Sequence, residues 1–265
     1  HRRTVRSIRS GLCYNFKFKL QLEVITTRPA APARVRRSDG QQTRRELLDA
    51  AGRVFAEKGF ADPGRDVFFS SKGHDVPGLY AVLHALGEIP PERLMRLRRL
   101  GGLDGHPELG IPGIEANSGS LGMGLSKGRG IALAKRLQGR PGRVVVMTGD
   151  GELQEGQNWE GLQAAAHDRV DTLWAIVDRN ELQSDRPTEE ILALGDLEAK
   201  LRAFGWHVEQ CDGHDVAALR RAFAACRAVT DRPQAIVAHT IKGRGVSFME
   251  HPQALRDGGG LYRWH

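Results

Sequence analysis

The stretch from Arg143 to Asp185, RVVVMTGDGELQEGQNWEGLQAAAHDRVDTLWAIVDRNELQSD, decides the fold of this chain. It begins with an apolar run, Val144–Met147, whose β-branched residues and short length favour a strand buried on both faces over an amphipathic helix. Helix-forming sequence follows from Glu160 to His167, and a second apolar run covers Leu173–Val177. The pattern predicts an α/β protein with a doubly wound, mainly parallel sheet and helices on both faces.

Polar side chains follow both predicted strands. The first strand ends in Gly149-Asp150-Gly151, and Asn180 follows the second strand about thirty residues later. Because parallel strands deliver their carboxyl ends to one edge of a sheet, we expect Asp150 and Asn180 to lie together. Their oxygens suit Mg2+, which often completes its coordination with substrate phosphates. The glycines permit positive backbone angles and leave room for a diphosphate. GDG alone could also be a tight turn after a strand.

The motif GDG, followed after about thirty residues by Asn, resembles the thiamine-diphosphate motif, and the segment GDGELQEGQNWE resembles the transketolase family in particular. This resemblance implies a thiamine-diphosphate-binding fold in which Asp150, the Asn180 side chain and the Leu182 carbonyl hold Mg2+. It also implies that Gly151 packs against the diphosphate. Glu155 would lie at a contact between subunits, beside the cofactor-activating glutamate of the family.

Three histidines stand in further motifs of the same family. His74 lies in an SKGH loop after a short predicted strand, His106 lies in a GHPE segment, and His265 ends the chain in the sequence LYRWH. The resemblance implies that these are catalytic residues that contact substrate, reach the reacting carbons and lie by the diphosphate, respectively. Near neutral pH a histidine can both donate and accept protons. A surface histidine is the alternative interpretation for each one taken alone.

The glycine-rich loop Asn117–Gly124, NSGSLGMG, leads into a helix predicted through Ala132 to Leu137. Glycines at such a junction serve either the close approach of a ligand or tight helix packing. The family resemblance assigns Gly119 and Leu121 to the aminopyrimidine and thiazolium parts of the cofactor.

The N-terminal part differs in composition from the rest. Residues 1–45 carry 12 Lys and Arg against 2 acidic residues, so the net charge of +7 comes from this end and the remainder is slightly acidic. We expect a disordered basic tail at 1–42, an amphipathic helix at 43–61 and a transketolase-like domain at 62–265, truncated at its C-terminus. The helix also resembles the first helix of tetracycline-repressor-type regulators, but no recognition helix follows.

The overall composition predicts a cytoplasmic globular protein. Hydrophobic residues make up 40% of the chain. No apolar run approaches the roughly twenty residues that a membrane helix needs, and the basic N-terminus has no apolar signal core. Three widely spaced cysteines indicate neither a disulfide framework nor a zinc site.

The resemblance implies transfer of a two-carbon ketol unit from a ketose phosphate to an aldose phosphate, as in the pentose phosphate pathway, with thiamine diphosphate and Mg2+ as cofactors. It also implies a pyrimidine-binding partner, either a separate subunit or a missing C-terminal half, in a dimer or heterotetramer. Two alternatives stay open. One is another thiamine enzyme, such as deoxyxylulose-phosphate synthase or a 2-oxoacid dehydrogenase component. The other is a DNA-binding regulator built on residues 43–60.

Overall fold

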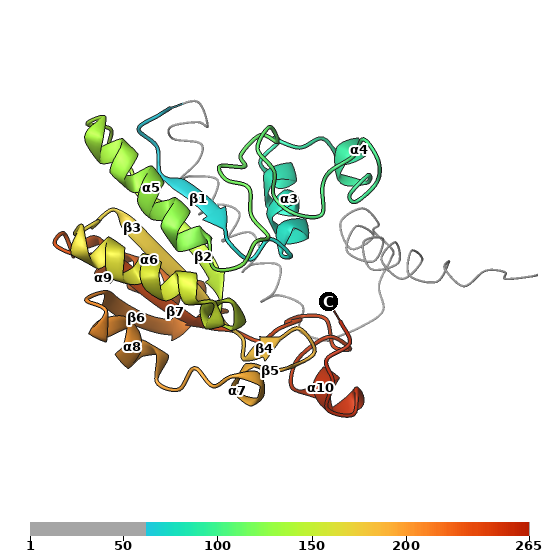
Figure 1. The fold of residues 1–265 in the computed structure, drawn as a ribbon. Coiled ribbons are helices and arrows are strands. Elements are labelled where there is room, and N and C mark those ends of the chain that lie inside the picture. Colours follow the sequence, from blue (N-terminus) through green and yellow to red (C-terminus); the bar gives the residue numbers. More distant parts are fainter. Residues whose placement is uncertain (1–61, 265) are drawn as a thin grey trace, which may run out of the picture. The chain divides into compact units, whose positions relative to one another are not determined.

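The computed structural model describes residues 62–264, so the predicted basic tail, the predicted helix at 43–61 and His265 lie outside the described residues. The described part is an α/β domain in which a five-stranded parallel sheet carries helices on both faces (Figure 1). The fold class predicted from the sequence is therefore confirmed.

In chain order the elements are β1 (Val67–Ser70), α3 (Val76–Ala85), α4 (Pro91–Leu94), α5 (Gly124–Leu137), β2 (Val144–Gly149), the 3-10 turn η1 (Gly151–Gln154), α6 (Gly156–His167), β3 (Leu173–Arg179), β4 (Leu182–Gln183), β5 (Arg186–Pro187), α7 (Thr188–Ile191), α8 (Leu197–Ala203), β6 (His207–Asp212), α9 (Val216–Arg227), β7 (Gln234–His239) and α10 (Gln253–Asp257). None of these helices is long and apolar enough to cross a lipid bilayer.

The large sheet has the strand order β1-β2-β3-β7-β6, and every neighbouring pair in it is parallel. Strands β4 and β5 form a separate antiparallel hairpin. Because the five strands run in the same direction, their carboxyl ends meet at one edge of the sheet. The segments that follow β1, β2, β3 and β7 therefore come together there, although they are far apart in the sequence.

Alternate residues of the central strands pack against different helices. Val144 and Val146 of β2 belong to the core cluster that includes residues of α5, α6 and α8, whereas Val145 packs with residues of α9. In β3, Leu173 belongs to the same cluster as Val144, whereas Trp174 packs with the residues of α9. Side chains alternate across a strand, so helices on both faces require an unbroken apolar run. This is why the run was recognisable as a buried strand.

Helix α5 approaches the sheet closely at Gly128. A Cβ atom added there would lie 2.5 Å from Val146 Cγ2 and 2.9 Å from Leu173 Cδ1. Gly130, two positions later in the same helix, has no atom within 4 Å of the equivalent point. Glycine lowers the helix propensity at both positions, but only Gly128 is required by packing.

This contrast gives a matched pair of substitutions. We expect G128A to lower the free energy of unfolding by about 1–3 kcal/mol, because the new methyl group must displace two core side chains. G130A should raise it by up to about 1 kcal/mol through better helix propensity. Urea unfolding followed by circular dichroism measures both. Equal effects of the two substitutions would contradict the close packing of α5 on the sheet.

Candidate functional site

The candidate site lies at the carboxyl ends of β1, β2 and β3, where loops from distant parts of the sequence meet. Ser71 and Lys72 follow β1, Asp150 follows β2, and Asn180 follows β3. The structure therefore brings the two predicted side-chain ligands of the metal to the same edge of the sheet, as the parallel arrangement requires.

Asp150 is almost inaccessible to solvent, with 1% of its surface exposed. Its Oδ2 accepts a hydrogen bond from the backbone N–H of Glu181 at 2.6 Å and lies 3.4 Å from Nη1 of Arg179. Its Oδ1 accepts a hydrogen bond from the Gly151 N–H at 2.7 Å. Burial raises the pKa of Asp150, although these hydrogen bonds and Arg179 act in the opposite direction. Burial makes the negative charge of this carboxylate unfavourable, and a bound metal cation would compensate that charge.

Asn180 and Leu182 lie in the turn that begins at the end of β3. The Asn180 Oδ1 accepts a hydrogen bond from the Leu182 N–H at 3.0 Å, and the Asn180 side chain also hydrogen-bonds Asp178. Because Glu181 lies between them and binds Asp150, the three predicted metal ligands are close neighbours.

Two lysines to which the sequence analysis assigned no role complete this edge. Lys72 Nζ lies 2.6 Å from Asp178 Oδ2, and the Thr240 hydroxyl donates to the same carboxylate. Burial opposes ionisation of Asp178, but Lys72 and these hydrogen bonds outweigh it and hold its pKa below the usual range. Lys242 forms no ion pair within the described residues, and its ammonium lies 5.2 Å from the centroid of the Tyr262 ring. Burial, and then the nearby Lys72, lower the pKa of Lys242.

Both lysines stand in motifs that could have identified them. Lys72 belongs to the SKGH loop, and Lys242 to the sequence TIKGRG after β7. Their spatial relation to Asp178 depends on the pairing of β1, β2, β3 and β7, which the motifs do not specify. Lys242 forms no ion pair within the described residues, so its ammonium group is suited to an anionic ligand.

The glycines of the GDG turn lie in tight surroundings. Neither Gly149 nor Gly151 has a positive φ, so the backbone freedom that glycine permits is not used here. Side chains of neighbouring segments instead approach both glycines closely. A Cβ on Gly151 would lie 2.8 Å from Gln183 Cγ, and one on Gly149 would lie 3.0 Å from Lys72 Cδ. Among residues 62–264, the buried Gln183 Oε1 has no hydrogen-bond partner. A polar ligand could supply that partner.

Glu152 joins three loops through a single carboxylate. Its side chain is buried, and its Oε1 accepts hydrogen bonds from the Ser71 hydroxyl and from the Gly122 N–H, the latter at 2.9 Å. Its Oε2 accepts a hydrogen bond from the Gly149 N–H at 3.2 Å. Glu152 was visible in the sequence only as part of the GELQEG motif. Its contacts connect the SKGH loop, the glycine-rich loop and the GDG turn.

His74 and His106 lie on loops that touch each other. A Cβ on Gly73 would lie 2.7 Å from His106 Cδ2, and one on Gly119 would lie 2.6 Å from the same atom. Gly119 has a φ of +118°, so both its backbone conformation and its packing favour glycine. Both imidazoles retain access to solvent. Partial burial, and then the Lys72 ammonium, lower the pKa of His74. The neutral imidazole that this favours can accept one hydrogen bond and donate another.

Two predicted cofactor contacts, Leu121 and Glu155, lie on an exposed surface. Leu121 and Met123 have 42% and 37% of their surfaces exposed, and Glu155 is exposed between them, where a Cβ on Gly122 would lie 2.8 Å from Glu155 Cβ. We call Leu121, Met123 and Glu155 the glycine-loop surface. Exposed apolar side chains grouped beside a charged residue are typical of a protein–protein contact.

The residues at the carboxyl edge fit a metal ion bound together with a diphosphate. Within residues 62–264, no three His, Cys, Asp or Glu side chains are grouped so that they could hold a metal by themselves. A hard cation at Asp150 would therefore depend on amide, carbonyl and phosphate oxygens. The buried charge of Asp150, the ammonium of Lys242 and the orphaned Gln183 oxygen all fit such a ligand.

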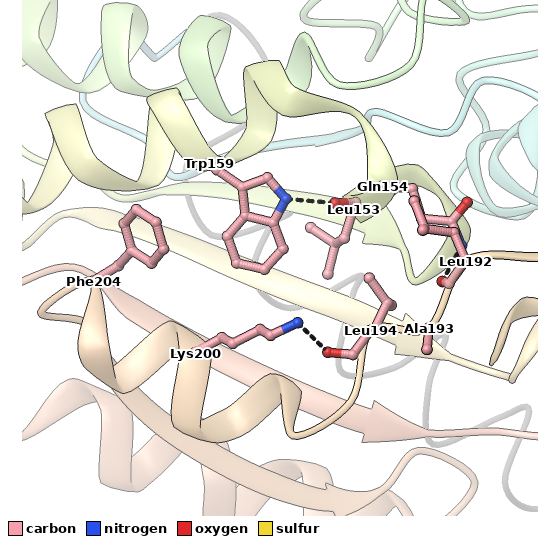
Figure 2. A pocket seen from close by; sticks show the side chains of 8 residues that line it. All are labelled: Leu153, Gln154, Trp159, Leu192, Ala193, Leu194, Lys200 and Phe204. Carbon is pink, nitrogen blue, oxygen red and sulfur yellow. Dashed lines mark hydrogen bonds between the residues drawn. The ribbon is translucent and has the colours of Figure 1, made fainter.

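The hollow shown in Figure 2 is lined by none of these residues and lies against η1, α6, α8 and the segment after α7. It has a volume of about 420 Å3 and is lined by Leu153, Gln154, Trp159, Leu192, Ala193, Leu194, Lys200 and Phe204. The Trp159 Nε1 donates to the Leu153 carbonyl at 2.8 Å, and the Lys200 Nζ donates to the Leu194 carbonyl at 2.5 Å. One lysine among apolar side chains does not make a site for a metal and a diphosphate.

Comparison with known proteins identifies relatives over most of the chain. The family profile described as "Transketolase, thiamine diphosphate binding domain" matches residues 53–258. The chain is 39% identical to one of the subunits of the apulose-4-phosphate transketolase of Phocaeicola vulgatus, over 76% of this chain and 69% of that protein. It is 42% identical to the SqwG subunit of the 6-deoxy-6-sulfo-D-fructose transketolase of Clostridium sp., over 71% of this chain and 69% of that protein.

A solved transketolase has the same fold. The transketolase of Leishmania mexicana matches with a TM-score of 0.68 and 31% sequence identity, over 71% of this chain. The match covers 31% of the Leishmania chain, so this protein spans about a third of the length of that transketolase.

The contacts of Glu152 predict a specific loss of stability. We expect E152Q to lower the free energy of unfolding by about 1–3 kcal/mol, because the amide NH2 would face a hydrogen-bond donor and leave it unsatisfied. E155Q, on the exposed neighbour, should change it by less than about 0.5 kcal/mol. Urea unfolding compares the two variants. If E152Q is as stable as E155Q, Glu152 does not hold the loops together.

Proposed function

The chain belongs to the transketolase family, as its thiamine-diphosphate-binding domain, and we propose that it is the diphosphate-binding subunit of a two-chain transketolase. The proposed reaction transfers a two-carbon ketol unit from a ketose phosphate to an aldose phosphate. Two relatives that this chain matches over 69% of their length are named as transketolase subunits, which supports the two-chain form. The particular sugar phosphates are left open.

The observation that carries the proposal is the arrangement of charges at the carboxyl ends of β1, β2 and β3. Asp150 offers a buried carboxylate beside the ammonium groups of Lys72 and Lys242. In this proposal Asp150, the Asn180 side chain and the Leu182 carbonyl hold Mg2+. Lys242, which forms no ion pair within the described residues, then offsets part of the remaining charge of the diphosphate.

The neighbouring groups would border the rest of the cofactor. Gly149 and Gly151 carry no side chains of their own, and the Gln183 side chain lies close to Gly151 with an amide oxygen that lacks a partner among the described residues. Gly119 and Leu121 would form the wall against the aminopyrimidine and thiazolium rings. Leu121 is exposed enough to do so.

When bound, thiamine diphosphate supplies the electron sink that carbon–carbon cleavage requires. The residues of this chain would orient the sugar and move protons. We assign His74 and His106 to hydrogen bonds with sugar hydroxyls, because their loops touch and their rings are accessible. His265, which lies outside the described residues, is the proposed third member. Glu152 would keep the loops that carry these groups together.

The proposed partner is a pyrimidine-binding subunit that covers the glycine-loop surface. Leu121 and Met123 are exposed apolar side chains, and Glu155 beside them is exposed as well. In this arrangement Glu155 lies at the contact between subunits, and the assembly is a dimer or a heterotetramer. Covering this surface would also exclude water from the rings of the cofactor.

The metal assignment predicts the behaviour of D150A. We expect this variant to stay folded but to lose more than about 100-fold in Mg2+-dependent affinity for thiamine diphosphate, since loss of even an outer-shell partner costs about 10–100-fold. D231A, which removes an exposed aspartate, is the control and should bind normally. Isothermal titration with and without Mg2+ measures the affinity. Unchanged affinity in D150A would rule out the metal assignment.

The two-chain proposal predicts that the purified protein alone does not transfer ketol units. Addition of a pyrimidine-binding partner should produce transfer from a ketose phosphate to an aldose phosphate, and that partner by itself should be inactive. Pyruvate decarboxylation measured on the same mixture distinguishes the reaction from that of a 2-oxoacid enzyme. Robust ketol transfer by this chain without a partner would refute the half-enzyme proposal.

A further inference from the structure

Arg179 is a buried cation in contact with the proposed metal ligand. It is the last residue of β3, and 10% of its side chain is exposed. Its Nη1 lies 3.4 Å from Asp150 Oδ2, and its Nη2 lies 2.6 Å from Glu189 Oε1. Nothing in the proposed reaction uses this guanidinium. A buried arginine between two carboxylates nevertheless changes what the first carboxylate can bind.

The position of Arg179 follows from the strand. Adjacent residues of a strand point to opposite faces, so Asp178 and Arg179 reach different partners. Asp178 pairs with Lys72 at 2.6 Å, whereas Arg179 reaches Asp150. Both aspartates of the site therefore have a cation from the chain itself as a partner.

We propose that Arg179 is a positioning residue for Asp150 that acts as its resident counter-cation and keeps the affinity for a divalent metal low until a diphosphate is present. This inference rests on the proposed metal site. A metal ion bound by Asp150 alone would meet the repulsion of a guanidinium in a poorly solvated environment, where like charges interact strongly. A diphosphate brings the negative charge that removes this penalty, so the metal and the diphosphate would bind together.

Glu189 controls how closely the guanidinium approaches Asp150. Arg179 is nearer to Glu189 than to Asp150, by 2.6 Å against 3.4 Å. The same carboxylate accepts hydrogen bonds from the N–H groups of Leu194 and Gly195, each at 3.3 Å, which fixes it to the segment after α7. Glu189 therefore draws the guanidinium away from Asp150. Without that negative charge, Asp150 would be the remaining carboxylate that forms an ion pair with Arg179 within the described residues.

A different role for Arg179 predicts the opposite result. If the guanidinium only holds Asp150 in the correct orientation, its removal should weaken metal binding. If it acts as a competing cation, its removal should strengthen metal binding. The sign of the change therefore separates the two roles.

The experiment is a titration of the full chain with Mn2+ alone, followed by electron paramagnetic resonance of the free ion, and then with pyrophosphate added. We expect R179M to bind Mn2+ alone about tenfold more tightly than the wild type and to gain less from pyrophosphate. R179K keeps the charge and should stay close to the wild type. R232M removes an exposed arginine and is the control.

E189Q tests the same idea with the opposite sign and little risk to folding, because 39% of the Glu189 side chain is exposed. It should weaken the binding of Mn2+ alone by a few fold, since the guanidinium is released toward Asp150. The inference is overturned if R179M binds Mn2+ alone no better than the wild type, or if E189Q binds it more tightly. Thermal unfolding without metal checks that each variant is folded.

D150N in the same titration separates this inference from the proposed function. If D150N binds Mn2+ as the wild type does, the metal site itself is misassigned and both proposals fail. If D150N loses binding while R179M gains none, the metal site stands and only the role of Arg179 is overturned.

Discussion

The geometry of the site depends on the buried carboxylate of Glu152. This one group accepts hydrogen bonds from Ser71 after β1, from Gly122 in the glycine-rich loop and from Gly149 at the end of β2. Loops at the end of a parallel sheet have no ladder of hydrogen bonds of their own, so another group must fix their relative positions. A carboxylate suits this purpose because it only accepts hydrogen bonds and can take several donors at once. These bonds link the SKGH loop and the glycine-rich loop to the GDG turn that carries Asp150.

Near Glu152, most charged side chains of the site form pairs of opposite charge. Lys72 neutralises Asp178, Arg179 faces Asp150, and Lys242 has no carboxylate partner within the described residues. Unpaired charge in a partly buried position is unfavourable unless a ligand compensates it. The arrangement therefore favours a ligand that carries both a cation for Asp150 and negative charge for Lys242. A metal diphosphate has these properties.

The apolar hollow beside Trp159 shows why concavity alone does not identify the site. Its lining is mainly apolar, and the polar atoms of Trp159 and Lys200 already bind backbone carbonyls. The charged groups at the edge of the sheet are not among the residues that line this hollow. The exposed Leu121 and Met123 lie on the glycine-loop surface, where that partner would bind.

The sequence by itself determined the β–α–β core and the common edge of Asp150 and Asn180, because the apolar runs of β2 and β3 are local signals and parallel strands must end on the same side. The SKGH and GHPE motifs also placed His74 and His106 on loops. Only the tertiary structure decided the pairing of Lys72 with Asp178, which are 106 residues apart. It also decided the approach of Arg179 to Asp150 and the close contact of Gln183 with Gly151. These contacts depend on strand order and loop packing, which no local period in the sequence encodes. The same limit applies to Gly149 and Gly151. A glycine can be favoured by a positive backbone angle or by a neighbouring side chain, and the folded chain shows that neighbouring side chains crowd these two, which have no positive φ.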